Sequence, residues 1–392
     1  MRIAVSGIGV ISAIGNGAEE NLRALRAGRS GVGPLTLFAS RHAVPVGEVR
    51  LSNPVLKELL GIAPAAVVSR TALLGMAAAG EALTDAAPGG SLRVGLVSAT
   101  SVGGMDLTER FFGDFMRDPA AGRIALAAQH DPAYSTARIA AHCGITGYTT
   151  TISTACSSAA NAILLAARLI EHGICDAVVA GGCDALSKFT LNGFMSLGIL
   201  DPAPCRPFDA SRAGLNLGEG AGYLVLQRAD SLVKEPYCYL AGYANANDAF
   251  HQTASSPMGE GAYRAMSGAL RRAGIGPEQV GYVNVHGTGT PNNDAAEAAA
   301  LERLFGDEVP PFSSTKHFTG HTLAAAGGIE AVYSALAAAR GIRYGSPYFR
   351  TPVEGTRLVP CGSFEENVPV ERVLTNSFGF GGNDTSLIFS KR

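Results

Sequence analysis

Two stretches of this chain are apolar on every side and are built mainly of small residues. Residues 157–169 read SSAANAILLAARL, and residues 322–339 are dominated by Ala, Gly and Ser. A helix without a polar face is buried rather than amphipathic, and small side chains let such a helix lie close to sheets on both sides. The sequence therefore predicts a layered core with these two helices in its middle.

Short β-rich runs alternate with longer helical stretches. Expected strands are 3–6, 94–98, 150–154, 177–180, 223–227, 239–243, 282–286, 373–377 and 386–390, and expected helices lie near 18–27, 70–86, 157–172, 261–273, 294–305 and 321–340. This alternation favours an α/β architecture with largely parallel pairing. A composition shift at 228–236 suggests two halves, 1–232 and 233–392, that pack together. Each half has a strand that leads to a reactive residue, Cys156 in the first and His286 in the second, so the halves could be remote duplicates.

Charge and cysteine usage exclude several classes of protein. The chain has 31 Lys and Arg against 33 Asp and Glu, which argues against a nucleic-acid binder. Only 16% of the residues are charged, so surface is expected to be hidden in a subunit interface as well as in the core. Seven cysteines without a CxxC motif disfavour a disulfide framework or a structural metal. No apolar run is long enough for a membrane span, and Gly residues interrupt the apolar start of the chain, so a buried first strand and a cytoplasmic protein are expected.

Cys156 lies where a β-like run, TTIST, meets the first apolar helix. A thiol at a helix N-terminus faces unpaired N–H groups and the positive end of the helix dipole, and both favour the thiolate. The alternative is a small buried hydrophobic residue without chemistry. The strand-to-helix setting makes Cys156 the candidate nucleophile among the seven cysteines.

His286 ends the strand-like run GYVNVH and leads into GTGTP, residues 287–291. Such a turn places backbone N–H groups and the hydroxyls of Thr288 and Thr290 at the carboxyl end of a strand, where open α/β sheets bind ligands. The alternative is a core histidine that ends a strand.

Lys316 and His321 precede the second small-residue helix, and Glu330 lies within it. A Lys and a Glu in apolar surroundings are costly unless they pair. A nearby Lys also favours a thiolate and a neutral imidazole. His317 is expected on the surface.

Two glycine-rich segments have different interpretations. Residues 218–222 precede a strand rather than a helix, which fits no phosphate-binding loop. Residues 377–382, SFGFGG, are typical of a mobile apolar lid, and the alternative is a tight turn between the last two strands.

Four blocks of sequence together resemble the β-ketoacyl-acyl-carrier-protein synthases of the thiolase superfamily, of the synthase II kind. They are TACSSA at 154–159, HGTGTP at 286–291, STKHFTGH at 314–321 and NSFGFGG at 376–382, accompanied by Asp294, Glu297 and Glu330 as supporting residues. The resemblance covers essentially the whole chain. It implies a thiolase-like five-layered α/β/α/β/α fold built from two related halves, a dimer, and decarboxylative condensation of acyl thioesters.

The resemblance also implies the role of each catalytic residue. Cys156 would take the acyl group, and the backbone N–H groups of Cys156 and Phe380 would form the oxyanion hole. His286 and His321 would hold the thioester carbonyl of malonyl-acyl-carrier protein as it loses carbon dioxide. Lys316 would support them in an ion pair with Glu330, and Phe380 would also gate the acyl pocket.

The resemblance implies partners rather than a cofactor or a metal. Substrates would arrive on the phosphopantetheine arm of an acyl carrier protein, with Thr288 and Thr290 binding the arm. Because a carrier protein is acidic, Arg206 and Arg70 are the candidates for contacting it. The second subunit would be an identical chain or a chain-length-factor-like homologue.

The chain departs from the family pattern in several places. The lid continues with Asn383 and Asp384 where Thr-Asn is common, and Ala159 stands where Gly is frequent. Segments near 105–140 and 190–205 look short, which affects acyl chain length and partner choice. The segments TGHTLAAAG and NANDAFHQTASSP lean towards specialised pathways such as aryl-polyene synthesis.

Three other interpretations fit the residues less well. A non-catalytic chain-length-factor-like subunit would lack the reactive cysteine. A Cys–His hydrolase leaves Lys316, the second histidine and GTGTP without a role. A coenzyme A-dependent thiolase usually has a second cysteine near its C-terminus, whereas Cys361 lies outside the lid.

Overall fold

The computed structural model describes all 392 residues, and its centre is a mixed sheet with the strand order β11-β10-β12-β13-β9-β1-β8-β7-β5-β6. The strands of the first half are β1 (Ile3–Ser12), β5 (Val94–Ala99), β6 (Thr149–Ile152), β7 (Ala177–Asp184) and β8 (Gly220–Arg228). Those of the second half are β9 (Cys238–Asn247), β10 (Tyr282–Asn284), β11 (Phe312–Ser313), β12 (Arg372–Gly379) and β13 (Asn383–Ser390). All nine expected strands are confirmed.

The two halves repeat one topology. Numbered by their order along the chain, the five strands of each half lie side by side in the order third, second, fourth, fifth, first. The halves join where Ile3–Val5 of β1 pairs antiparallel with Cys238–Leu240 of β9. A fold built from two related halves is therefore confirmed, and the exact boundary at 232/233 stays a prediction.

The prediction of largely parallel pairing is wrong. Only the pairs β5–β6, β5–β7, β10–β11 and β10–β12 are parallel, and the pairs between them in the sheet are antiparallel. The parallel pairs are linked through helices, whereas β12 and β13 form a hairpin. The alternation of helices and strands along the sequence does not reveal that the first and last strands of each half are antiparallel neighbours.

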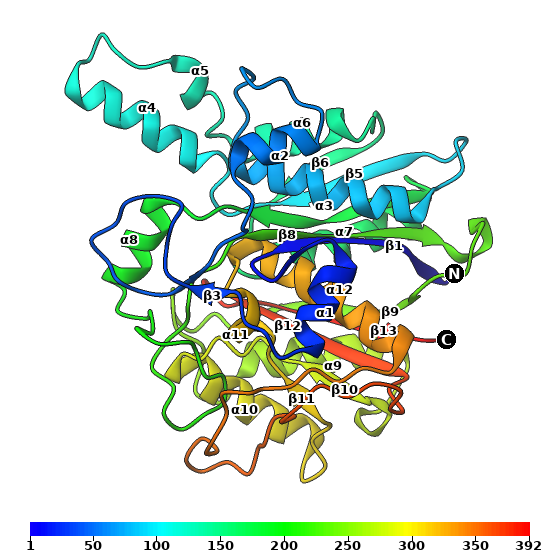
Figure 1. Ribbon diagram of the computed structural model, residues 1–392. Coiled ribbons are helices and arrows are strands. Elements are labelled where there is room, and N and C mark those ends of the chain that lie inside the picture. Colours follow the sequence, from blue (N-terminus) through cyan, green and yellow to red (C-terminus); the bar gives the residue numbers. More distant parts are fainter.

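Helices and strands form five layers, as the resemblance implies (Figure 1). One outer layer holds α3 (Arg70–Ala86) and α6 (Pro132–His142), and the other holds α9 (Glu260–Ala273) and α10 (Pro291–Phe305). Between the strands of the two halves lie α7 (Ser158–Glu171) and α12 (Ala326–Arg340), which contact each other and strands of both halves. These are the two small-residue helices, so their central placement is confirmed.

Small residues let α12 touch the backbone of β8. A Cβ built on Gly328 would stand 2.3 Å from the carbonyl oxygen of Gly222, and a Cβ on Gly222 would stand 2.3 Å from the nitrogen of Ile329. No side chain fits between these two backbones. The composition of the second central helix therefore follows from its close packing.

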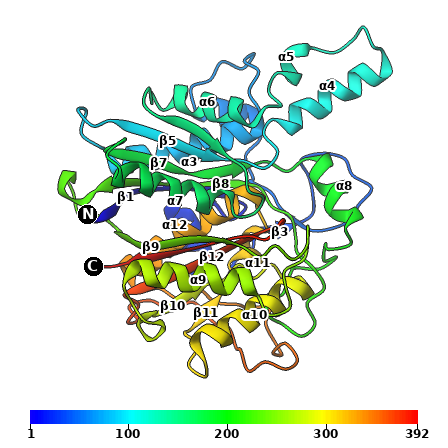
Figure 2. The same ribbon diagram turned by 180° about the vertical axis from the view of Figure 1, so that it is seen from behind.

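The remaining elements are short or peripheral. They are α1 (Ala18–Arg26), α2 (Asn53–Leu59), α4 (Met105–Arg117), α5 (Ile124–Ala127), α8 (Lys188–Ser196), α11 (Lys316–Thr319), β2 (Gly15–Asn16), β3 (Val32–Gly33) and β4 (Val46–Gly47), with single 3-10 turns at 229–231, 277–279 and 323–325. Helices α4 and α5 project from the body of the molecule (Figure 2). No helix combines the length and the apolarity needed to cross a membrane.

Candidate active site

A cavity of about 350 Å³ collects candidate residues from both halves. Its lining includes Cys156, His286, Thr288, Thr290, His321 and Phe380, together with Phe194, Leu197, Ile199, Leu215, Thr253, Ser255, Asn292, Phe378 and Gly379–Gly382. The first half supplies the sulfur and most of the apolar wall. The second half supplies both imidazoles and the lid.

A tight turn carries Cys156 from β6 to the start of α7. Ala155 has a φ of 53°, a left-handed conformation that is uncommon for a residue with a side chain. The hydroxyl of Ser158 fixes the turn, because it accepts a hydrogen bond from the Thr154 amide at 2.7 Å and donates one to the Ala155 carbonyl at 2.5 Å. Cys156 is thereby held at the end of the buried helix, as expected.

Burial and the neighbouring groups act in opposite directions on the thiol of Cys156. Burial raises its pKa to about 11, although the charge of Lys316 and the amides of Phe380 and Cys156 act in the opposite direction. Desolvation of the sulfur thus outweighs the helix end, against the direction expected from the helix end alone.

The two imidazoles face each other at the opposite wall. The ring centroids of His286 and His321 lie 5.5 Å apart with an interplanar angle of 85°, and Phe378 packs 5.7 Å from His286. The Leu323 amide donates to Nδ1 of His321 at 3.2 Å, and the Lys316 ammonium, which can only donate, lies 3.4 Å from Nδ1 of His286. In both rings Nδ1 is an acceptor, so Nε2 carries the proton.

Both histidines are neutral at ordinary pH. Burial lowers the pKa of each imidazole well below its usual value, and the charge of Lys316 lowers it further. The site therefore presents two neutral N–H donors rather than two cations.

Lys316 and Glu330 form the expected buried ion pair. The ammonium also donates to the carbonyl oxygen of His286 at 2.6 Å. Burial raises the pKa of Glu330 to about 7, and the charge of Lys316 opposes this rise. Lys316 thus holds His286 by its backbone and by its ring.

Glu297 and Asp294 shape the turn after β10. The carboxylate of Glu297 accepts from the amides of His286 at 2.9 Å and Gly287 at 2.8 Å, and Asp294 accepts from the Gly289 amide at 3.2 Å. These bonds present Thr288 and Thr290 to the cavity, with their hydroxyl oxygens 2.9 Å apart.

The glycine-rich segment lines the cavity as the hairpin turn between β12 and β13, which is the expected alternative, and its movement as a lid stays a prediction. The Phe380 ring stacks on Phe194 of α8 with centroids 6.1 Å apart. A Cβ on Gly379 would stand 2.8 Å from the Thr154 carbonyl oxygen, so the lid lies directly against the cysteine turn. The amides of Phe380 and Cys156 both interact with the sulfur, which places both expected oxyanion donors together.

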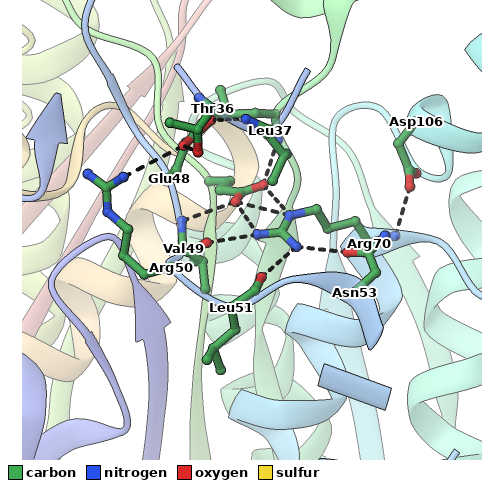
Figure 3. A network of polar contacts seen from close by, with 11 residues as sticks. Thr36, Leu37, Glu48, Val49, Arg50, Leu51, Asn53, Arg70 and Asp106 are labelled. Carbon is green, nitrogen blue, oxygen red and sulfur yellow. Dashed lines mark hydrogen bonds and ion pairs between the residues drawn. The ribbon is translucent and has the colours of Figure 1, made fainter. Parts of the chain in front are cut away.

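Arg70 lies at the centre of a network of polar contacts (Figure 3). It is not a surface residue, so the expectation that it contacts a carrier protein is wrong. Its side chain is only 2% exposed and pairs with Glu219 at 2.6 Å. It also donates to the carbonyl oxygens of Val49 and Leu51. Arg206 is 29% exposed and pairs with Asp201 at 3.2 Å, which leaves it accessible to a partner.

His317 is also buried, contrary to expectation. Its ring packs against Phe318 and Tyr348, and burial lowers its pKa to about 3. The short helix α11 turns this residue inward, which its loop-like sequence does not indicate.

Sequence reasoning missed Asp184 and Phe194. Asp184 ends β7, and its carboxylate accepts from Thr100 at 2.5 Å and from the Ala324 amide at 2.9 Å, which ties the two halves together beside His321. Phe194 supports the lid. Neither residue belongs to a recognisable motif, so only the fold could reveal them.

Comparisons with known proteins agree on one family. The models "Beta-ketoacyl synthase, N-terminal domain" and "Beta-ketoacyl synthase, C-terminal domain" match residues 1–231 and 237–345. The 3-oxoacyl-[acyl-carrier-protein] synthase 2 of Coxiella burnetii is 33% identical over 413 residues, covering 100% of this chain and 98% of the relative.

Two solved structures are similar over nearly their whole length. The ishigamide ketosynthase/chain length factor superimposes with a TM-score of 0.94 at 30% identity, covering 100% of this chain and 99% of that one. The ketosynthase of AntDE:AntF, a type II PKS acyl-carrier protein in complex with its ketosynthase bound to the hexaketide, gives a TM-score of 0.91 at 26% identity with the same coverage.

Proposed function

The chain belongs to the β-ketoacyl synthase family, and we propose that Cys156, His286 and His321 carry out the condensation that defines it. The chain is a β-ketoacyl-acyl-carrier-protein synthase, an acyltransferase that joins an acyl thioester to a malonyl unit and extends it by two carbons. The observation that carries our assignment of roles is the meeting of one sulfur and two neutral imidazole donors in a single cavity.

In the first step the sulfur of Cys156 attacks the carbonyl of the incoming acyl thioester. The negative charge on the tetrahedral oxygen is stabilised by the N–H groups of Cys156 and Phe380, each contributing about 2.7–4 kcal/mol of transition-state stabilisation. The bond to the carrier sulfur breaks, and the proton of Cys156 ends on the released phosphopantetheine thiol. This proton transfer accompanies attack because the resting thiol is neutral.

In the second step the malonyl thioester loses its carboxylate as carbon dioxide. The electron pair moves onto the thioester carbonyl oxygen, where the Nε2–H groups of His286 and His321 donate to the enolate. Its carbon then attacks the acyl-Cys156 carbonyl, and the carbon–sulfur bond breaks to release the β-ketoacyl product and the Cys156 thiolate. The thiolate takes a proton from water, which restores the neutral thiol. Lys316 and Glu330 position His286 throughout.

Substrate delivery is proposed to depend on an acyl carrier protein. Thr288 and Thr290 line the cavity and would bind the phosphopantetheine arm, so no cofactor of the chain's own is invoked. Arg206 would contact the acidic carrier. The structural relative that is in complex with its acyl-carrier protein supports this proposal.

The second subunit is proposed to be an identical chain or a chain-length-factor-like homologue, as in the ishigamide relative. Fatty-acid or polyketide synthesis is the supported process. The aryl-polyene branch stays a prediction from the sequence.

Intact mass spectrometry tests the nucleophile. We expect acyl-carrier-protein substrates of graded length to add one acyl mass to the parent chain and none to Cys156→Ala. Cys143→Ala is the matched control, because Cys143 is a half-buried cysteine outside the cavity, and it should acylate like the parent. Acylation that persists in Cys156→Ala would contradict the assignment.

A further inference from the structure

A buried carboxylate that takes no part in the proposed reaction lies between the two halves. Asp184 is the last residue of β7 and is fully buried. Its Oδ1 accepts from the Thr100 hydroxyl at 2.5 Å and from the amides of Ser101 at 3.0 Å and Val102 at 3.4 Å. Its Oδ2 accepts from the Ala324 amide at 2.9 Å and from the Ser101 amide at 3.1 Å. The carboxylate therefore joins the loop after β5 to the start of the central helix of the second half.

These donors support the negative charge of Asp184. Burial raises the pKa of its carboxyl group to about 6, and the hydrogen bonds just described act in the opposite direction. The group is therefore mostly ionised at neutral pH, where both of its oxygens accept. Backbone amides can only donate, so the arrangement requires an acceptor on each side of the carboxyl group.

The Ala324 amide belongs to the turn that fixes the ring of His321. Within this turn the Leu323 amide donates to Nδ1 of His321 at 3.2 Å. Leu323 has a φ of 53°, a left-handed conformation that is uncommon for a residue with a side chain and that persists only where its surroundings hold it. The His321 amide donates to the Asn216 carbonyl at 2.7 Å. The strained residue thus lies between two anchors in the first half, Asn216 before it and Asp184 after it.

We propose that Asp184 is a positioning residue for His321. By holding the Ala324 amide, it keeps Leu323 in its strained conformation with its N–H aimed at Nδ1 of the ring, so that Nε2 carries the proton. Asp184 does not line the cavity and acts through the turn. The benefit to the enolate rests on the proposed function of His321, whereas the effect on the tautomer of the ring does not.

Asp184→Asn should break one side of this network. The amides of Ser101 and Val102 cannot reverse, so the asparagine oxygen should stay with them, and its NH2 group should face the Ala324 amide. Two donors then meet, and the bond that holds the turn is lost. The new side chain has the shape of the old one, so the variant should stay folded, which thermal unfolding checks.

Thr100→Val is the matched control. It removes a donor from the same carboxylate but leaves the Ala324 amide its acceptor. Any loss of stability at Asp184 that does not pass through the turn should therefore appear in this variant too, while the ring of His321 should stay as it is in the parent chain.

Nitrogen NMR of isotope-labelled histidine rings tests the proposal without using the enzyme's chemistry. The chain has 8 histidines, and the signals lost in His321→Gln identify this ring. We expect a protonated Nε2 and an unprotonated Nδ1 in the parent and in Thr100→Val, and a mixture of both tautomers in Asp184→Asn. A parent ring with the proton on Nδ1 would overturn the proposal before any variant is made, as would a parental tautomer in Asp184→Asn or a mixture in Thr100→Val.

The two half-reactions provide a second readout. In Asp184→Asn, kcat for decarboxylation of malonyl-acyl-carrier protein should fall by about ten- to a hundredfold, because the donor is misplaced, with KM little changed. Acylation of Cys156 should not fall, since His321 takes no part in it and the charge of Asp184 raises the pKa of the sulfur.

A purely structural role for Asp184 would lower both half-reactions together, and that result would contradict the proposal. If the parent chain released no carbon dioxide from malonyl-acyl-carrier protein, the proposed function would fail. The tautomer comparison would still decide whether Asp184 positions His321, so the two failures are distinguishable.

Discussion

At the scale of single residues, Lys316 links the ion pair to the histidines. Its ammonium reaches Glu330, the His286 carbonyl and the His286 ring. The sequence predicted this set because the four motif blocks carry residue types that serve one reaction. The errors, Arg70 and His317, depend on burial. The partner of Arg70 is Glu219, 149 residues away, and such a pairing leaves no local signal.

Removing the charge of Lys316 should shift the pH dependence of decarboxylation. In Lys316→Met the pKa of both imidazoles rises, because the nearby cation that lowers them is gone. The acidic limb of the profile, where the imidazoles become protonated, should therefore move to higher pH, and the rate at neutral pH should fall at least tenfold. Release of carbon dioxide from malonyl-acyl-carrier protein measures both effects.

Glu330→Gln is the control for that shift. It keeps the ammonium, so the acidic limb should stay near that of the parent chain even if the rate falls. An equal shift in both variants would assign the effect to the lost ion pair rather than to the charge.

Substitution of Arg70 should lower the stability of the protein, whereas substitution of Arg206 should weaken the binding of the carrier protein. Arg70→Met leaves the buried Glu219 without its partner and should lower the free energy of unfolding by about 3–5 kcal/mol. Arg206→Ala, at a partly exposed position, should leave stability within about 1 kcal/mol but weaken carrier-protein binding. Urea unfolding and titration with the carrier protein measure the two effects. If a folded Arg70→Met variant bound the carrier protein more weakly, the expectation that Arg70 contacts the carrier protein would be restored.

At the scale of elements, the sequence located the strands and the central helices but not their connections. Composition marked α7 and α12 as buried because no polar face is available on either. Strand direction was missed because a run of β-branched residues looks the same whether its neighbour is parallel or antiparallel. Helices α4 and α8 were missed because neither carries a motif or a fully apolar stretch.

Because α12 packs closely on β8, one added methyl group should lower the stability of the protein at Gly328 but not at Gly80. Gly328→Ala should cost about 1–3 kcal/mol, because the new carbon overlaps the Gly222 carbonyl. Gly80→Ala in α3 is the matched control: its Cβ meets nothing within 4 Å, and it should stabilise by up to about 1 kcal/mol. Thermal unfolding of both variants measures the two effects. An unchanged stability of Gly328→Ala would show that the layers can separate at little cost.

At the scale of the whole molecule, the low charge content predicted hidden surface beyond the core. The structure locates exposed apolar side chains on the projecting arm: Phe112, Phe115 and Met116 of α4, and Ile124 of α5. Exposed apolar clusters of this kind mark interfaces. The identity of the other subunit could not follow from one sequence, because complementarity is a property of two surfaces.

Charging the arm should break the proposed dimer. Phe112→Glu/Met116→Glu should have the mass of one 40.2 kDa chain by light scattering, while the parent is larger, alone or with its homologue. Val233→Glu is the control, since Val233 is 74% exposed on the linker between the halves. A parent that stays monomeric with every partner supplied would remove the interface proposal.

The repeated topology places Cys156 and His321 in corresponding positions, each between the third strand of its half and the central helix that follows. Each half thus brings a different group to one shared cavity, the sulfur from the first and the imidazoles from the second. Neither half alone holds both kinds of group, so the proposed reaction requires the two halves to stay joined.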